Sequence, residues 1–233
     1  MYIMNSHYTY LLLDFFSVIF PLALSFDKKV AFYKLWKYLL PAIIINSVLF
    51  MLWDMYFTEH GVWSFNPKYI TGIYVFNLPV EEVLFFVVVP YSCAFIYECL
   101  NTYVEKEIVT KPKLVTIIVL VLSLASCILF YNKIYTVVNA GICFTVVFIA
   151  AFLYKFNQPG RFYFSFFVAL IPFLIFDGFI TGLPIVHYNG NENMGIRFFS
   201  IPLEDFFYCL SMLLNTVLIM DYFKTRRPTH SIF

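Results

Sequence analysis

Long apolar runs dominate this chain and limit what it can fold into. A run of roughly 17 to 25 apolar residues is long enough to cross a bilayer as a helix. Seven such runs lie at residues 8–26, 37–56, 77–99, 114–131, 134–154, 162–181 and 201–223. With 62% hydrophobic and 12% charged residues, the chain has too little polar surface to cover a soluble globule. We therefore expect an all-α, polytopic integral membrane protein with about seven transmembrane helices.

The distribution of Lys and Arg predicts the orientation of these helices, because cytoplasmic loops collect basic residues. With the N-terminus outside and the C-terminus cytoplasmic, the cytoplasmic side holds Lys28, Lys29, Lys34, Lys37, Lys106, Lys111, Lys113, Lys155, Arg161, Lys224, Arg226 and Arg227. The opposite side holds only Lys68, Lys133 and Arg197. We expect this orientation, in the cell membrane. The first run lacks a basic n-region and a small-residue cleavage site, so we expect a retained span and not a removed signal peptide.

An internal duplication organises the polar residues. Residues 54–86 lie over residues 177–209 without a gap, at an offset of 123 positions. The identical pairs are Asp54/Asp177, Thr58/Thr181, Asn66/Asn189, Gly72/Gly195, Ile73/Ile196, Phe76/Phe199, Pro79/Pro202 and Glu81/Glu204. Because helices one to three recur as helices five to seven, the copies keep the same orientation, with a pseudo-twofold axis along the membrane normal. We expect two parallel three-helix repeats, residues 1–110 and 134–233, joined by a linking helix within 111–133.

Each copy carries the same acidic motif at the head of an apolar run. The motifs are Pro79-Val80-Glu81-Glu82 and Pro202-Leu203-Glu204-Asp205, and Asp54 and Asp177 precede the two prolines by 25 positions. A single such motif is typical of a plain helix start, with proline in the first turn, carboxylates at the positive end of the dipole, and Asn77 or Ser200 as a cap. Duplication at membrane depth favours a functional role. We expect these six acids to meet near the outer side of the bilayer.

These acids have no basic partners, since no Lys or Arg lies in the interior of a predicted span. Carboxyl groups in such surroundings resist ionisation and share protons, which suits proton transfer. Nearby rings are candidates to bind a substrate or stabilise a carbocation with their faces, although plain membrane packing is the alternative. They are Trp53, Trp63, Phe85, Phe86, Phe206, Phe207 and Tyr208. The aromatic outer loop at 57–76 is either an interfacial belt or a lid over the acids.

Other chemistries lack their sequence signatures. The chain has no GxGxxG segment for a flavin or nicotinamide, no DDxxD pair for a magnesium-held diphosphate, and no Lys in the last helix to hold retinal. Its five cysteines are scattered singly through apolar runs. We expect no cofactor, no metal site and no nucleic-acid partner.

At the tandem Pro-x-Glu-(Glu/Asp) motifs the chain resembles the integral-membrane lycopene cyclases, over nearly its whole length and with one cyclase repeat in each half. The resemblance implies conversion of the linear ψ ends of lycopene to rings, with β rings giving β-carotene via γ-carotene. The reaction is started by acid, passes through a carbocation and is redox-neutral. The implied partners are lycopene or a related linear carotenoid, the lipid bilayer, and other membrane enzymes of carotenoid biosynthesis.

Within that reaction we predict that Glu81 and Glu204 supply the acid. Glu82, Asp205, Asp54 and Asp177 are then base or tuning groups, with the assignment among them open. One composite site and two separate sites also stay open. Two other functions remain as alternatives: a small proton-coupled transporter or channel built from paired repeats with membrane acids, and a non-enzymatic carotenoid or quinone binding protein.

Overall fold

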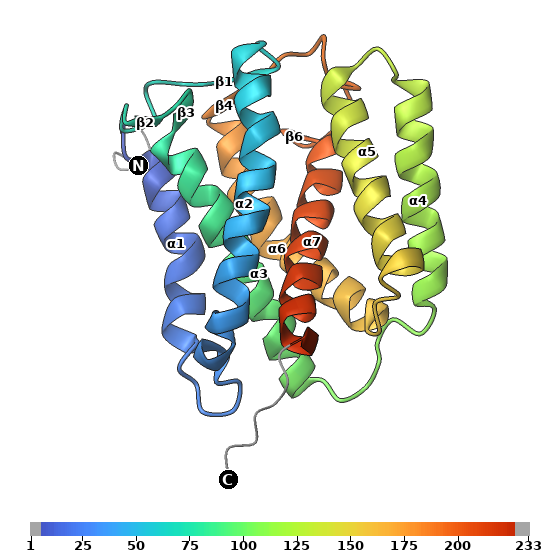
Figure 1. Ribbon diagram of the computed structural model, residues 1–233. Helices are drawn as coiled ribbons and strands as arrows, with labels where there is room; N and C mark the ends of the chain where they lie inside the picture. The colour runs from blue at the N-terminus through green and yellow to red at the C-terminus, as the bar shows by residue number, and fades with distance from the viewer. Residues whose placement is uncertain (1–5, 227–233) are drawn as a thin grey trace.

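Most of the described chain is helical, as expected. The computed structural model describes residues 6–226, so Arg227 of the predicted cytoplasmic tail lies outside the described residues. The helices found there are α1 (Thr9–Leu24), α2 (Trp36–Glu59), α3 (Val80–Tyr103), α4 (Pro112–Leu129), α5 (Ile134–Phe148), α6 (Pro159–Gly182) and α7 (Glu204–Arg226). A 3-10 turn, η2 (Phe32–Leu35), leads into α2, and a π-helical turn, η3 (Ile149–Leu153), extends α5. The helices form one elongated bundle, with α4 at its edge (Figure 1).

The predicted fold class, a polytopic all-α membrane protein, is confirmed. Among the described residues, six helices are long and apolar enough to cross a bilayer. The seventh, α1, has 16 residues, fewer than the roughly 20 that span a typical hydrocarbon core. A short hydrophobic helix is accommodated by local thinning of the bilayer. The linking helix α4 turns most of its surface outward, with only Thr116 and Ser123 buried.

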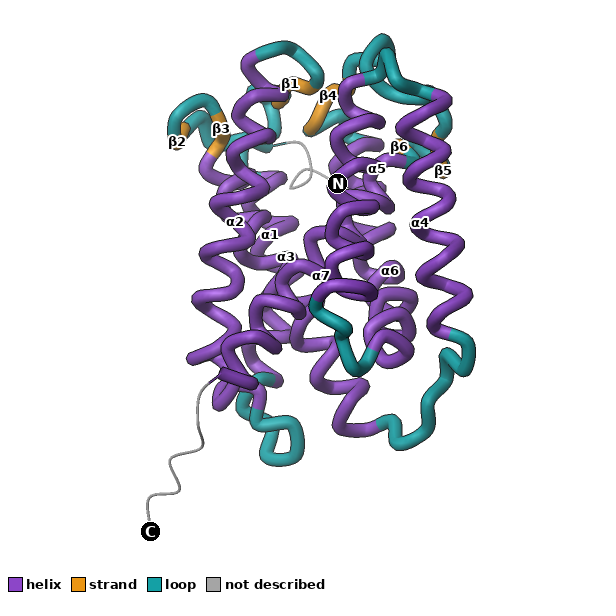
Figure 2. Tube along the Cα trace, turned by 45° about the vertical axis from the view of Figure 1, so that its right-hand side comes forward, coloured by secondary structure: helices purple, strands orange, loops and turns teal. Residues whose placement is uncertain are grey.

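Short strands, which the sequence did not predict, join the loops at one end of the bundle (Figure 2). β1 (Trp63–Phe65) pairs antiparallel with β4 (Val186–Tyr188), so the two outer loops are joined to each other. Within each loop a small hairpin precedes the motif helix. These hairpins are β2 (Tyr74–Val75) with β3 (Leu78–Pro79), and β5 (Arg197–Phe198) with β6 (Ile201–Pro202).

Contacts recur at equivalent positions of the two halves. Ser64 pairs with His187, its equivalent at the 123-residue offset, so the β1–β4 ladder is centred between the halves. The N–H of Val80 donates to the carbonyl of Ile73 at 2.8 Å, and Leu203 repeats this with Ile196 at 3.0 Å. This agreement supports two repeats about a pseudo-twofold axis. Their boundaries at 110, 133 and 134 stay a prediction.

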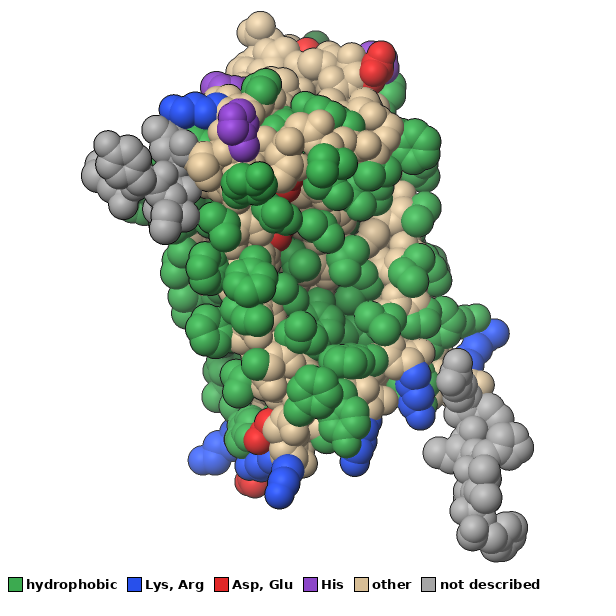
Figure 3. Space-filling view, turned by 90° about the vertical axis from the view of Figure 1, so that its left-hand side faces the viewer, with side chains coloured by type: hydrophobic (Ala, Val, Ile, Leu, Met, Phe, Trp, Pro, Cys, Tyr) green, Lys and Arg blue, Asp and Glu red, His purple; other side chains and the backbone are tan. Residues whose placement is uncertain are grey.

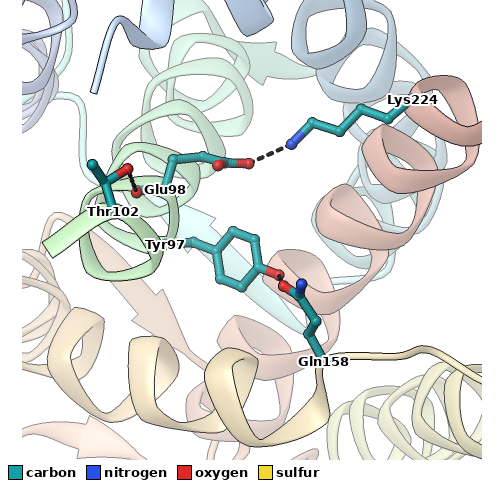
Figure 4. Close-up of polar contacts among 5 residues, drawn as sticks. All are labelled: Tyr97, Glu98, Thr102, Gln158 and Lys224. Atoms are coloured by element: carbon teal, nitrogen blue, oxygen red, sulfur yellow. Dashed lines mark hydrogen bonds and ion pairs between the residues drawn. The ribbon is translucent and has the colours of Figure 1, made fainter. Parts of the chain in front are cut away.

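The two halves pack through their motif helices. α3 contacts α6 as well as α1 and α2, while α7 contacts α2 as well as α5. Asn215 of α7 donates to Asn46 of α2 at 2.7 Å, a hydrogen bond of the kind that joins membrane helices. At the end of the bundle opposite the strands, Lys224 of α7 lies 2.5 Å from Glu98 of α3 (Figure 4). α7 is thus tied to α2 in the core and to α3 at the end of the bundle.

Candidate active site

A cavity between the halves collects acids from both. Its volume is about 50 Å³, enough for a few water-sized groups. Three carboxyl side chains reach it, Glu82 from α3, Asp177 from α6 and Asp205 from α7. The other lining residues are aromatic or aliphatic: Tyr10, Trp63, Phe65, Phe85, Tyr135, Phe173, Ile180, Val186, Tyr188 and Tyr208. The two halves therefore share one composite cavity.

The outer loops close this cavity on one side. Trp63 and Phe65 of β1 and Val186 and Tyr188 of β4 belong to its wall. Because β1 and β4 pair with each other, both loops are held in place over the acids. Two residues of the outer loop at 57–76 thus lie against the acid cavity, and the belt and the lid both stay predictions.

The helix starts explain how the motif acids are held. Pro79 is the N-cap of α3 and no side chain caps that helix. Instead, Asn77 donates to the carbonyl of Met55 at 2.8 Å, and the hydroxyl of Thr181 donates to Ser200 at 2.7 Å. These bonds tie the hairpins to α2 and α6. The first turns of α3 and α7 then carry the acids, where the helix dipole favours negative charge.

The first acid of each motif holds the loop before it. Glu81 accepts the N–H of Thr71 at 2.7 Å, and Glu204 accepts the N–H of Met194, also at 2.7 Å. Thr71 and Met194 are themselves equivalent positions, 123 residues apart. The Thr136 hydroxyl adds a second bond to Glu204 at 2.6 Å. Both carboxyl groups are buried and neither lines the cavity.

The second acid of each motif faces the cavity and accepts tyrosine hydroxyls. Tyr10 donates to Glu82 at 2.7 Å. Asp205 accepts from Tyr135 and, at 3.0 Å, from Tyr188. Burial, together with the charge of Asp205, raises the pKa of Tyr188 well above its ordinary value, so this phenol stays protonated and donates. Asp205 thus has two phenol donors, whereas Glu82 has one.

The preceding aspartates each lie beside a second motif acid. Asp54 lies next to Glu82, is fully buried, and has no hydrogen bond of good geometry among the described residues. It does not line the cavity. Asp177 lies next to Asp205 and does line it, with Oδ2 free of any hydrogen-bond partner in the described chain. Each half thus supplies one pair of adjacent carboxyl groups.

No basic side chain among residues 6–226 lines the cavity. Among the described residues, the one salt bridge joins Glu98 and Lys224, at the far ends of α3 and α7. Two adjacent carboxyl groups in an apolar site do not both ionise without a cation, so each pair retains a proton. The arrangement is suited to giving and accepting protons.

The predicted aromatic residues divide between the cavity and the core. Trp63, Phe85 and Tyr208 line the cavity. Trp53 and Phe86 pack in the hydrophobic cluster around it, and Phe207 packs in a second cluster further along the bundle. Phe206 contacts the rings of Phe173 and Phe198 without reaching the cavity wall.

Sequence reasoning missed the tyrosines that bind the cavity acids. Tyr10 and Tyr135 are equivalent, because their N–H groups donate to the equivalent carbonyls of Tyr69 and Glu192. They lie 125 positions apart rather than 123, so a fixed offset hides the match. Asp14, one turn after Tyr10, is also buried close to Glu82 and Glu81. Allowing a two-residue gap between the copies would have found both tyrosines.

Comparison with known proteins identifies the family. The sequence model described as lycopene cyclase matches residues 7–100 and 132–223, one segment in each half and together most of the chain. Similar curated proteins are named bifunctional lycopene cyclase/phytoene synthases. That of Aspergillus oryzae is 29% identical over 68 residues, that of Neurospora crassa 34% over 59, and that of Fusarium fujikuroi 26% over 100.

These matches are local. They cover 29%, 25% and 38% of this chain, and only 12%, 10% and 16% of the three relatives. No solved structure matches the chain. The family model nevertheless spans both halves, including both acidic motifs. The chain belongs to the lycopene cyclase family, with the two matching segments in one polypeptide.

Proposed function

We propose that this protein is a lycopene cyclase, an intramolecular lyase or isomerase that closes the ψ ends of lycopene into β rings. The observation that carries the proposal is the composite cavity, in which three acids from both halves face a wall of rings. Family membership supplies the substrate class. A hydrocarbon substrate is dissolved in the bilayer, where these helices also lie.

The proposed reaction begins and ends with a proton transfer. A neutral carboxyl group protonates the terminal double bond of a ψ end, which forms a tertiary carbocation. An internal double bond attacks this cation and closes the ring. A carboxylate then removes a proton, which leaves a ring double bond. One proton is gained and one is lost, so the product is an isomer and no redox cofactor is consumed.

We assign proton donation to Asp177 and not to Glu81 or Glu204. Asp177 has an unpartnered oxygen and lines the cavity, and it lies beside Asp205, whose two phenol donors favour the carboxylate form. Glu81 and Glu204 are engaged with backbone N–H groups outside the cavity wall. Glu82 is then the base for the second proton, with Asp54 as its neighbour.

The rings of the wall protect and stabilise the cation. Trp63, Phe85 and Tyr208 present aromatic side chains to the cavity. A cation over an aromatic face is attracted by the ring quadrupole by roughly 0.5–2 kcal/mol. An apolar wall also keeps water from trapping the cation as an alcohol.

Expression in a lycopene-accumulating host tests the proposal, with pigments separated by chromatography. The wild-type chain is expected to convert lycopene to cyclic carotenoids, and Asp177→Asn to lower conversion by about 10²–10⁴-fold, the range for loss of a positioned acid. Glu98→Gln is the control, because Glu98 lies at the opposite end of α3. If the wild-type protein is folded in the membrane and lycopene stays unconverted, the proposed cyclase activity is ruled out.

A further inference from the structure

A large groove runs along the outside of the bundle next to the acid cavity. Its volume is about 480 Å³, within the range of roughly 300–1,000 Å³ that small-molecule sites occupy. Helices α1, α3 and α6 form it, with Leu13, Phe20, Val89, Cys93, Pro172 and Ile175 among its lining residues. Figure 3 views the molecule from the α1 side and shows a hollow in a mainly hydrophobic face.

The groove and the acid cavity adjoin each other across α6. Phe173 lines both. One turn later, Phe176 lines the groove and stacks on Phe85 of the cavity wall with ring centres 5.8 Å apart. Asp177, the next residue, lines the cavity. In Figure 3, acidic side chains are visible inside the hollow. A chain lying in the groove would therefore have its end at the acids.

The chemistry of the groove fits a hydrocarbon. Its polar side chains are those of Ser17, Ser92 and Cys93. Both serine hydroxyls are already used, because Ser17 donates to the carbonyl of Asp14 at 2.7 Å and Ser92 donates to the carbonyl of Ser17 at 2.8 Å. A thiol behaves as a small apolar group. In the described part of the chain, no charged side chain lines the groove.

We propose that this groove binds the polyene chain of the linear carotenoid while one of its ends reaches the acids of the adjoining cavity. The inference rests on the proposed function for the identity of the substrate. The substrate then enters sideways from the bilayer, between α1 and α6, and its unreacted part stays against the groove. An ordinary lipid tail is the competing occupant.

A matched pair of variants tests the groove. Ile175→Trp adds bulk inside it at a side chain that is 59% exposed, so the helix core is not disturbed. Ile44→Trp makes the same change on α2 at a side chain that is 63% exposed and lines neither site. Each is assayed with lycopene and with a shortened acyclic polyene that carries one reacting end.

With lycopene, Ile175→Trp is expected to lower turnover by at least about tenfold, the effect of losing roughly 1.4 kcal/mol of binding free energy. With the shortened polyene, the turnover of Ile175→Trp should stay within about twofold of wild type, because this substrate is too short to reach the groove. Ile44→Trp should match wild type with both. The proposal is overturned if the two Trp variants behave alike, or if Ile175→Trp impairs both substrates equally.

A binding measurement separates failure of the groove from failure of the proposed reaction. Asp177→Asn, purified in detergent from lycopene-containing cells, is expected to retain lycopene, and addition of Ile175→Trp should reduce the retained pigment at least about tenfold. Addition of Ile44→Trp should not. If the wild-type protein retains lycopene without cyclising it, and Ile175→Trp reduces the retained pigment, the groove proposal holds and the proposed reaction is wrong. Equal pigment in both double variants means that lipid fills the groove and lycopene does not.

Discussion

Adjacent acids in each motif have different surroundings. Successive helical residues point about 100° apart, because 3.6 residues make a turn. Glu81 therefore turns to the loop, where it accepts the N–H of Thr71, while Glu82 turns to the cavity and accepts the hydroxyl of Tyr10. The second motif repeats this division with Glu204 and Asp205. The first acid thus holds the preceding loop and the second faces the cavity.

This division predicts different effects for two neighbouring substitutions. Glu82→Gln is expected to lower cyclisation by about 10²–10⁴-fold, since an amide does not accept the second proton. Glu81→Gln should stay close to wild type, because its amide oxygen still accepts the N–H of Thr71. Chromatography of pigments at equal protein level measures both.

Glu81→Ala completes the comparison. It leaves the Thr71 N–H without its acceptor, at a cost of about 1–3 kcal/mol in the free energy of unfolding. Thermal unfolding in detergent should show that loss for Glu81→Ala and not for Glu82→Gln. A loss of activity in Glu81→Gln equal to that in Glu82→Gln would return the acid role to Glu81.

A glycine with positive φ precedes each hairpin that leads to a motif helix. Gly72 and Gly195 have φ of +79° and +75°, a conformation that side chains rarely adopt. Each directly precedes an isoleucine whose carbonyl accepts the N–H at the next helix start. The bend before each hairpin therefore needs glycine, and it places the carbonyl that the helix start binds.

Gly195→Ala is expected to destabilise the protein by about 1–2 kcal/mol through strain alone, because no atom lies within 4 Å of the added Cβ. Gly178→Ala is the matched control, since its Cβ also meets nothing within 4 Å but lies inside α6. There alanine should stabilise the helix by about 0.5–1 kcal/mol. The thermal unfolding midpoint should fall for Gly195→Ala and rise for Gly178→Ala. Equal shifts in the two variants would contradict a role for backbone strain at Gly195.

At the scale of the whole molecule, one composite cavity has a kinetic consequence. Under the proposed function, the two ends of lycopene are cyclised in separate visits, with the chain reversed in between. A monocyclic carotenoid is therefore expected to rise first and then fall while lycopene is converted by limiting protein. A chromatographic time course measures this, with excess protein as the control. Bicyclic product without any monocyclic pigment at limiting protein would indicate two sites acting together.

Orientation is a second property of the whole molecule. From the charge distribution we predict that the loop carrying Lys68 lies outside and the loop carrying Lys106 inside. A membrane-impermeant thiol reagent should label Lys68→Cys in intact cells, and Lys106→Cys only after permeabilisation. The native cysteines are buried or half-buried, so the wild-type chain measures the background. Labelling of Lys106→Cys in intact cells and of Lys68→Cys only after permeabilisation would show the opposite membrane orientation.

The sequence by itself determined the helices, the duplication and the set of acids. Hydrophobic length and a fixed offset are local properties of the chain, so they need no knowledge of its folding. The tertiary structure decided which acids share a cavity, because Glu82, Asp177 and Asp205 come from three helices whose contacts depend on packing. It also decided that Tyr135 and Tyr188 meet Asp205, across 70 and 17 positions. The packing of the whole bundle decides which helix faces meet and which loops pair. A short sequence motif contains neither kind of information.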